Sequence, residues 1–125
     1  MQTLPDSLSY LNGAYGALAD AKVSVLDRGF IFGDGIYEVL PVYGRRIFRF
    51  EEHMARLDRS LSKVRIANPH PAAGWLEIAR KLIAAHASDD QLVYIQVTRA
   101  PPLRAHALPP RPAPTVLPLA RPPTP

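Results

Sequence analysis

Short apolar and alternating stretches in the first half of the chain predict β-strands. Two of them, Ser9–Leu11 and Lys22–Leu26, are short, and turn-forming residues follow the second at Asp27–Gly29. A longer strand is expected at Ile36–Tyr43, where β-branched and aromatic residues are frequent, and a hairpin connects it to Ile47–Phe50. The first half of the chain is therefore expected to form a mainly antiparallel sheet.

The apolar period changes after Glu51 and predicts two helices. In the first helix, apolar residues recur at steps of three and four, namely Met54, Leu57, Leu61 and Val64. Asn68-Pro69 ends it, and a second helix begins near Pro71 with an apolar stripe made of Trp75, Ile78, Ala79, Leu82, Ile83 and His86. A strand at Gln91–Arg99 follows. Together these elements predict an α+β fold in which two helices pack on a largely antiparallel sheet.

The prolines divide the chain into two parts. Of the 14 prolines among the 125 residues, ten lie in residues 100–125. Because proline lacks a backbone N–H and fixes φ, neither a helix nor a central strand is expected in that part. We therefore predict one folded body at residues 1–99, where Pro41 indicates an edge or bulged strand, and a proline-rich extended segment at residues 100–125, which has the character of a linker.

Charge and composition exclude several classes of protein. Most of the net charge of +4 comes from three arginines scattered among the prolines of the tail, which do not form the basic stripe of a nucleic-acid binder. Without cysteine there is no disulfide framework and no thiolate nucleophile, and His53, His70 and His86 lack the spacing of metal ligands. The same lack of cysteine fits a reducing compartment, and no apolar run reaches the length of a membrane span. A soluble cytoplasmic protein without a metal is expected.

One motif is specific enough to suggest a family. Residues 27–39 have the sequence DRGFIFGDGIYEV, which closely resembles the N-terminal segment of the fold-type IV pyridoxal-phosphate aminotransferases. The likeness continues through residues 52–57, 64–66 and 94–99 and covers about residues 9–108. Within this class, the chain is most similar to the D-amino-acid aminotransferases. The resemblance implies the small N-terminal domain of a homodimeric enzyme that moves an amino group from a D-amino acid to a 2-oxo acid.

The resemblance also implies roles for four side chains. Arg56 matches the arginine that binds the cofactor phosphate, a role that suits a planar and permanently charged guanidinium. Tyr37 matches the tyrosine that faces the cofactor and helps to hold the substrate carboxylate. Arg104 and His106 match the remaining pair of carboxylate-binding residues, which come from the neighbouring subunit in that family. On an extended segment these two side chains project to the same side.

The chain departs from the family at two places. The chemistry needs a lysine that forms a Schiff base with the cofactor, but the three lysines, Lys22, Lys63 and Lys81, do not match the family's lysine region. In that family the region lies in a C-terminal domain, which the resemblance does not reach here, so the chain is expected to have no catalytic residue of its own and to be a truncated, non-catalytic part. Residues 100–103 also differ from the family pattern, which commonly has a glycine after the arginine.

Other functions stay open from the sequence. Branched-chain transamination and the aminodeoxychorismate lyase reaction both occur on the same fold. Residues 109–112 read PPRP and fit a polyproline ligand, so a non-catalytic interaction module is a further alternative. A gene remnant that folds poorly would expose the apolar face that its missing domain would cover.

Overall fold

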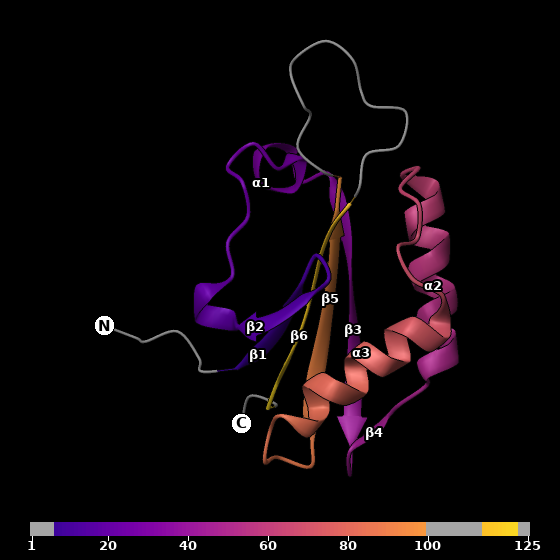
Figure 1. The fold of residues 1–125 in the computed structure, drawn as a ribbon. Coiled ribbons are helices and arrows are strands. Elements are labelled where there is room, and N and C mark those ends of the chain that lie inside the picture. The colour runs from indigo at the N-terminus through magenta and orange to yellow at the C-terminus, as the bar shows by residue number, and fades with distance from the viewer. Residues whose placement is uncertain (1–6, 100–113, 123–125) are drawn as a thin grey trace.

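The computed structural model describes residues 7–99 and 114–122, which form one sheet with the two long helices on one face and a short helix at the end of the other face (Figure 1). The six strands are β1 Leu8–Leu11, β2 Ala14–Ala17, β3 Gly35–Tyr43, β4 Arg46–Ile47, β5 Gln91–Thr98 and β6 Thr115–Arg121. The helices are a 3₁₀ turn at Leu18–Asp20, a short α1 at Arg28–Phe32, α2 at Phe50–Lys63 and α3 at Ala72–Ala84. The strand order is β2-β1-β6-β5-β3-β4, and every paired strand is antiparallel to its neighbour. The predicted α+β fold is confirmed.

The core lies between the sheet and the two long helices, α2 and α3. The apolar positions predicted for the first helix are buried at Met54, Leu57 and Leu61, and α3 contributes Trp75, which is 1% exposed. They pack on the inward side chains of β3, β5 and β6, which include Leu40, Val42, Val93, Ile95, Val97, Val116 and Ala120. The apolar faces of the helices, which repeat every 3.6 residues, therefore pack against the apolar face of the sheet, which repeats every two residues.

His86 lies beyond the end of α3 and is not part of its stripe. Its Nε2 is 2.8 Å from the carbonyl oxygen of Ala120 in β6. The expectation that His86 belongs to the helix is wrong, because α3 ends at Ala84 and the chain turns back toward β5.

The tail contains a central strand, which corrects the expected boundary at residue 99. Thr115–Arg121 forms β6 between β1 and β5 and pairs with β5 from Leu92 to Thr98. The inward side chains of β6 belong to the same core as the helices. The folded body therefore includes residues 115–121, and the expectation of a wholly extended segment at residues 100–125 is wrong for this part.

Pro118 is tolerated in β6 because of the direction in which its nitrogen points. Val116 accepts a hydrogen bond from the Asn12 backbone N–H and donates its own N–H to the Asn12 side chain, at 3.0 and 2.8 Å. Since residues two apart along a strand face the same neighbour, Pro118 also faces β1. β1 pairs with β6 at Ser9 and Leu119. Because the N–H that Pro118 lacks would point toward β1, no hydrogen bond is lost from the long ladder between β6 and β5.

The predicted strand at Lys22–Leu26 is absent. These residues form a connection in which Val23 and Val25 are 49% and 71% exposed. The second strand is instead β2, which pairs with β1 through the two-residue turn Asn12-Gly13. Both turn residues have positive φ, 50° and 98°, as a tight hairpin requires.

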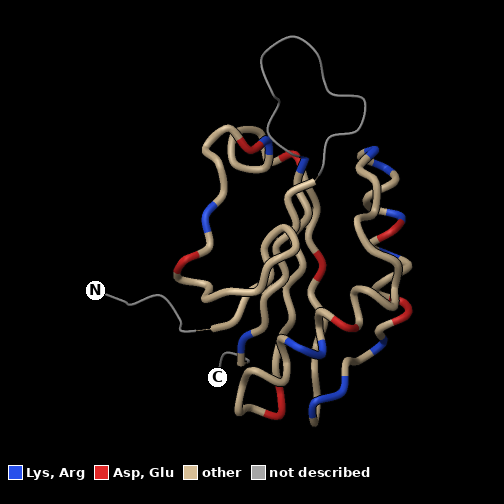
Figure 2. Tube along the Cα trace, in the orientation of Figure 1, with Lys and Arg blue, Asp and Glu red and all other residues tan. Residues whose placement is uncertain are grey.

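The charged residues lie mainly on the helices and on the connections at the ends of the strands, while the strands are mostly uncharged (Figure 2). Within the two described ranges, no helix has the length and apolar content needed to cross a membrane. In the same ranges, no group of three or more His, Asp or Glu side chains is arranged to hold a metal ion.

Candidate functional site

The first half of β3 carries the main cluster of charged side chains. β4 pairs only with Val42 and Tyr43, so along Gly35–Leu40 no described strand covers the second edge of β3. Helix α2 runs beside β3, on the face that holds Glu38. This arrangement leaves one open strand edge flanked by a helix, where side chains from both elements can meet a ligand.

Glu38 binds two side chains of α2. Its carboxylate is 3% exposed and accepts a hydrogen bond from Arg56 Nε at 3.0 Å on Oε2. Arg56 Nη2 also donates to Oε1, and His53 Nδ1 lies 2.7 Å from the same oxygen. Since His53 and Arg56 are three residues apart on α2, they lie on the same helix face and reach one carboxylate together.

The electrostatics favour the ionised forms of Glu38 and Arg56. Burial raises the pKa of Glu38, but hydrogen bonds and charge from Arg56 and His53 outweigh burial and lower that pKa. In turn, hydrogen bonding to Glu38 raises the pKa of the Arg56 guanidinium. The Arg56 side chain is 58% exposed, so its inner edge is fixed while its outer edge faces solvent.

Tyr37 lies on the opposite face of β3 from Glu38, because successive side chains of a strand alternate. Tyr37 is 71% exposed, and its partner in register is Gln96 of β5, which is also exposed. Tyr37 and Arg56 therefore flank the same open part of β3 from two sides. Arg104 and His106, the other two predicted site residues, lie outside the described residues.

A second charged cluster lies where β3 begins. Asp34 Oδ2 accepts hydrogen bonds from Arg28 Nε and Arg99 Nε, both at 2.8 Å. Arg99 also donates to the carbonyl oxygen of Val64, just after α2. The cluster joins α1, the end of β5 and the end of α2, and it leaves one uncompensated positive charge beside the open edge.

The ion pairs of Asp34 predict an acid-sensitive contribution to stability. The hydrogen bond from Arg28 lowers the pKa of Asp34 below its ordinary value of 3.8, and it outweighs the opposing effect of burial. A carboxyl group with a lowered folded-state pKa stabilises the fold above its unfolded-state pKa, and this stabilisation is lost as the pH falls through the folded-state value. The difference in urea midpoint between the wild type and Asp34→Asn should therefore be largest near neutral pH and shrink below about pH 4.

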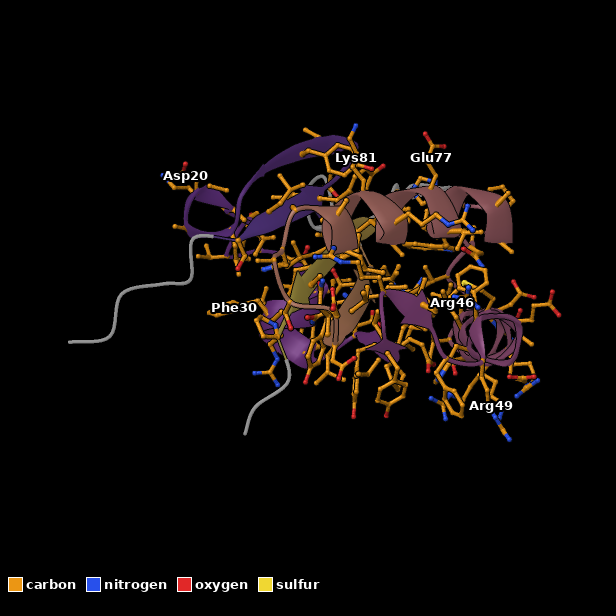
Figure 3. All side chains as sticks on the ribbon, turned by 90° about the horizontal axis from the view of Figure 1, so that it is seen from below. Asp20, Phe30, Arg46, Arg49, Glu77 and Lys81 are labelled. Atoms are coloured by element: carbon orange, nitrogen blue, oxygen red, sulfur yellow. The ribbon has the colours of Figure 1, made fainter. Side chains whose placement is uncertain are left out.

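The control for this measurement is Asp20→Asn, because Asp20 is exposed and points away from the sheet (Figure 3). The urea midpoint of Asp20→Asn should differ little from that of the wild type at every pH. If the difference in urea midpoint between Asp34→Asn and the wild type stays constant on acidification, the ion pairs of Asp34 do not stabilise the fold as stated.

A pocket of about 340 Å³ opens at the end of the sheet beside α1. It is lined by Val23, Asp27, Gly29, Phe30, Gln96, Thr98, Thr115 and Leu117. The side chain of Asp27, 3% exposed as a residue, accepts hydrogen bonds from Gly29 N at 2.8 Å, Thr98 Oγ1 at 2.7 Å and Thr115 Oγ1 at 2.5 Å. These bonds hold α1 against the ends of β5 and β6.

The sequence patterns pointed to Arg56 and Tyr37 but missed Glu38 and His53. A signal for Glu38 was present, since it occupies an inward position of a strand whose other inward residues, Leu40 and Val42, are apolar and buried. A carboxylate at such a position needs a cation, and α2 supplies it.

Comparison with known proteins identifies the family. A family model described as amino-transferase class IV matches residues 35–125. D-alanine aminotransferase of Staphylococcus aureus (strain MSSA476) is 37% identical over 100 residues, which are 80% of this chain and 36% of that protein. D-alanine aminotransferase of Listeria monocytogenes serotype 1/2a (strain 10403S) is 40% identical over 80 residues, 64% of this chain and 28% of that protein.

The solved structures agree on the fold. The branched-chain amino acid aminotransferase of Escherichia coli superimposes with a TM-score of 0.85 at 21% identity, over 94% of this chain and 41% of that chain. The branched-chain aminotransferase of Thermoproteus uzoniensis gives a TM-score of 0.79 at 22% identity, over 93% of this chain and 40% of that chain.

The chain belongs to the class IV aminotransferase family, and its sheet and helices have the fold of the N-terminal domain in that family. It spans less than half of the length of the relatives that it matches.

Proposed function

We propose that the chain is the N-terminal part of a pyridoxal-phosphate-dependent transaminase that moves an amino group from a D-amino acid to a 2-oxo acid. The observation that carries this proposal is the 37% identity to a D-alanine aminotransferase over 80% of the chain. The branched-chain aminotransferases with a similar fold are only 20–22% identical. Sequence similarity therefore favours the D-amino-acid branch over branched-chain transamination.

The side chains around the open edge of β3 fit the phosphate of the cofactor. Arg56 keeps a fixed, exposed guanidinium edge there, which suits an anion with several acceptor oxygens. When bound, the cofactor supplies the electron sink for the reaction. In this assignment Arg56 holds the phosphate, while Tyr37 binds the substrate carboxylate together with Arg104 and His106.

The chain alone is proposed to be non-catalytic. Its three lysines, Lys22, Lys63 and Lys81, are all exposed, and Lys81 lies over the ring of Tyr15, far along the chain from the β3 cluster. None of them lies in a segment that resembles the lysine region of the family. The amine that removes and returns the proton is therefore proposed to come from a C-terminal domain.

An exposed apolar surface supports a homodimer. Val25, Leu26, Phe30, Ile31 and Phe32 are between 47% and 71% exposed, and all come from α1 and the segment before it. An apolar patch of this kind is typical of a surface that another protein surface covers.

The function is tested by fusing this chain to the C-terminal part of S. aureus D-alanine aminotransferase. The matched control fuses the same part to the corresponding N-terminal part of the E. coli branched-chain enzyme. With a 2-oxo acid acceptor, our fusion should favour D-alanine over L-leucine, and the control fusion should favour it less. A cofactor-loaded fusion of our chain that transaminates L-leucine at least as fast as D-alanine would support the branched-chain alternative instead.

Arg56→Ala in this fusion should weaken binding of pyridoxal phosphate by roughly 10- to 100-fold, because a charge-assisted hydrogen bond contributes roughly 1.5–3 kcal/mol. Arg59→Ala is the matched control, since Arg59 is exposed on the same helix three residues further on. Its cofactor affinity should stay at the level of the parent fusion. Equal affinities for the two variants would remove the phosphate role from Arg56.

A further inference from the structure

We propose that Glu38 is a positioning residue that orients the Arg56 guanidinium, so that its outer N–H groups face a bound phosphate. This inference rests on the proposed function, in which Arg56 binds the cofactor phosphate. Neither the family comparison nor the sequence motif assigns a role to Glu38. The proposal extends the site from the residue that touches the ligand to the buried residue behind it.

The hydrogen bonds show which edge of Arg56 is occupied. Arg56 Nε lies 3.2 and 3.0 Å from the two oxygens of Glu38, and Nη2 donates to the first of them. A guanidinium has five N–H donors in one plane, so this fork uses the edge formed by Nε and Nη2. The N–H groups of Nη1 and the second N–H of Nη2 point away from Glu38 and stay available for an anion.

The two side chains of the Glu38–Arg56 pair differ strongly in burial. The Glu38 side chain is 3% exposed and the Arg56 side chain is 58% exposed. The buried Glu38 carboxylate therefore stays in place, and its hydrogen bonds hold the inner edge of the Arg56 guanidinium. A free surface arginine loses rotamer freedom when it binds a ligand, whereas a side chain that is already held loses less.

His53 fixes the carboxylate itself. Its Nδ1 lies 2.7 Å from Glu38 Oε1, and because a carboxylate only accepts hydrogen bonds, Nδ1 carries the proton. The His53 side chain is 16% exposed and lies one helical turn before Arg56. Glu38 is thus held by one residue of α2 while it orients another.

The proposal is tested on the full chain with Glu38→Gln, which keeps the shape of the side chain and removes its charge. Nuclear magnetic resonance of the Arg56 Nε–H group reports the orientation of the guanidinium without any ligand. Inorganic phosphate and pyridoxal phosphate are then titrated as probes. The control is Glu77→Gln, because Glu77 is exposed and points outward from α3 (Figure 3).

In the wild type, we expect an Arg56 Nε–H signal that is protected from exchange and shifts when phosphate is added. In Glu38→Gln, this protection should be lost and phosphate affinity should fall about tenfold, the cost of ordering one long side chain. Glu77→Gln should match the wild type in both measurements. Glu38→Asp keeps the charge but retracts the carboxylate, so it should lie between the wild type and Glu38→Gln if the latter folds poorly.

Three results would overturn the proposal, and they separate it from the proposed function. Unchanged protection of the Nε–H signal in Glu38→Gln and Glu38→Asp would show that Glu38 does not orient Arg56. Lost protection with unchanged or tighter phosphate binding would show that the orientation does not serve the ligand, while Arg56 would keep its phosphate role. A wild-type Arg56 signal that neither probe shifts would remove the phosphate role and the positioning role together.

Discussion

Replacing Asp27 by alanine is expected to destabilise the fold by about 4 kcal/mol, because three hydrogen bonds to one buried carboxylate are lost. The Asp27 carboxylate accepts from the backbone of Gly29 and from the hydroxyls of Thr98 and Thr115. Without it, the first turn of α1 loses its cap, and two buried hydroxyls lose their acceptor. The side chain connects three segments that are far apart in the sequence, so no neighbouring group can replace it.

Urea unfolding followed by the fluorescence of Trp75 measures this effect, since Trp75 is the single tryptophan and is 1% exposed. Asp27→Asn keeps one acceptor oxygen and should lose about half as much stability. Asp20→Ala, at an exposed position, should stay within about 0.5 kcal/mol of the wild type. A loss for Asp27→Ala as small as that for Asp20→Ala would show that the network does not stabilise α1.

The same network explains why β6 was not predicted from the sequence. Prolines in residues 100–125 argued against a central strand, and this reasoning is correct for a strand that needs both of its ladders. β6 needs only one long ladder, with β5, and Pro118 directs its missing donor to the other side. Thr115 adds a side-chain anchor to Asp27, which is 88 residues away in the sequence. Such long-range pairings leave no local pattern to find.

The elements that were predicted correctly are those whose burial follows from local periodicity. α2, α3, β3 and β5 each bury one face, and the apolar residues repeat at the matching period. Lys22–Leu26 has the same alternation but is exposed, because its valines belong to the surface around α1 and not to the sheet. The hairpin at Asn12-Gly13 had a clear local signal, two residues that accept positive φ, which the apolar pattern alone did not reveal.

The candidate site shows the same division. Arg56 and Tyr37 were predicted as site residues by resemblance, because the motifs that contain them are contiguous in the sequence, and their roles stay predictions. Glu38 is the next residue after Tyr37, yet its pairing with Arg56 depends on how α2 lies beside β3. A charged residue at an inward strand position is a useful sign of such a partner.

Replacing Gly29 by alanine is expected to cost about 3 kcal/mol, because the added methyl group has no space. A Cβ at this position would lie 2.3 Å from Thr98 Cγ2, 2.7 Å from Thr98 Cβ and 3.0 Å from Asp27 Oδ1. All three contacts are too short, and Thr98 cannot move away without losing its hydrogen bond to Asp27. Gly29 therefore serves the close approach of α1 to β5.

A second substitution tests this cause directly. Thr98→Ser removes Cγ2 but keeps the hydroxyl that donates to Asp27, so in the Gly29→Ala background it should restore part of the lost stability. The rescue should be partial, because Cβ of residue 98 still lies 2.7 Å from the new methyl group. Gly16→Ala is the control, since nothing lies within 4 Å of a Cβ there, and its stability should stay close to that of the wild type. A Gly29→Ala variant that is as stable as Gly16→Ala would contradict the clash with Thr98 as the reason for glycine at this position.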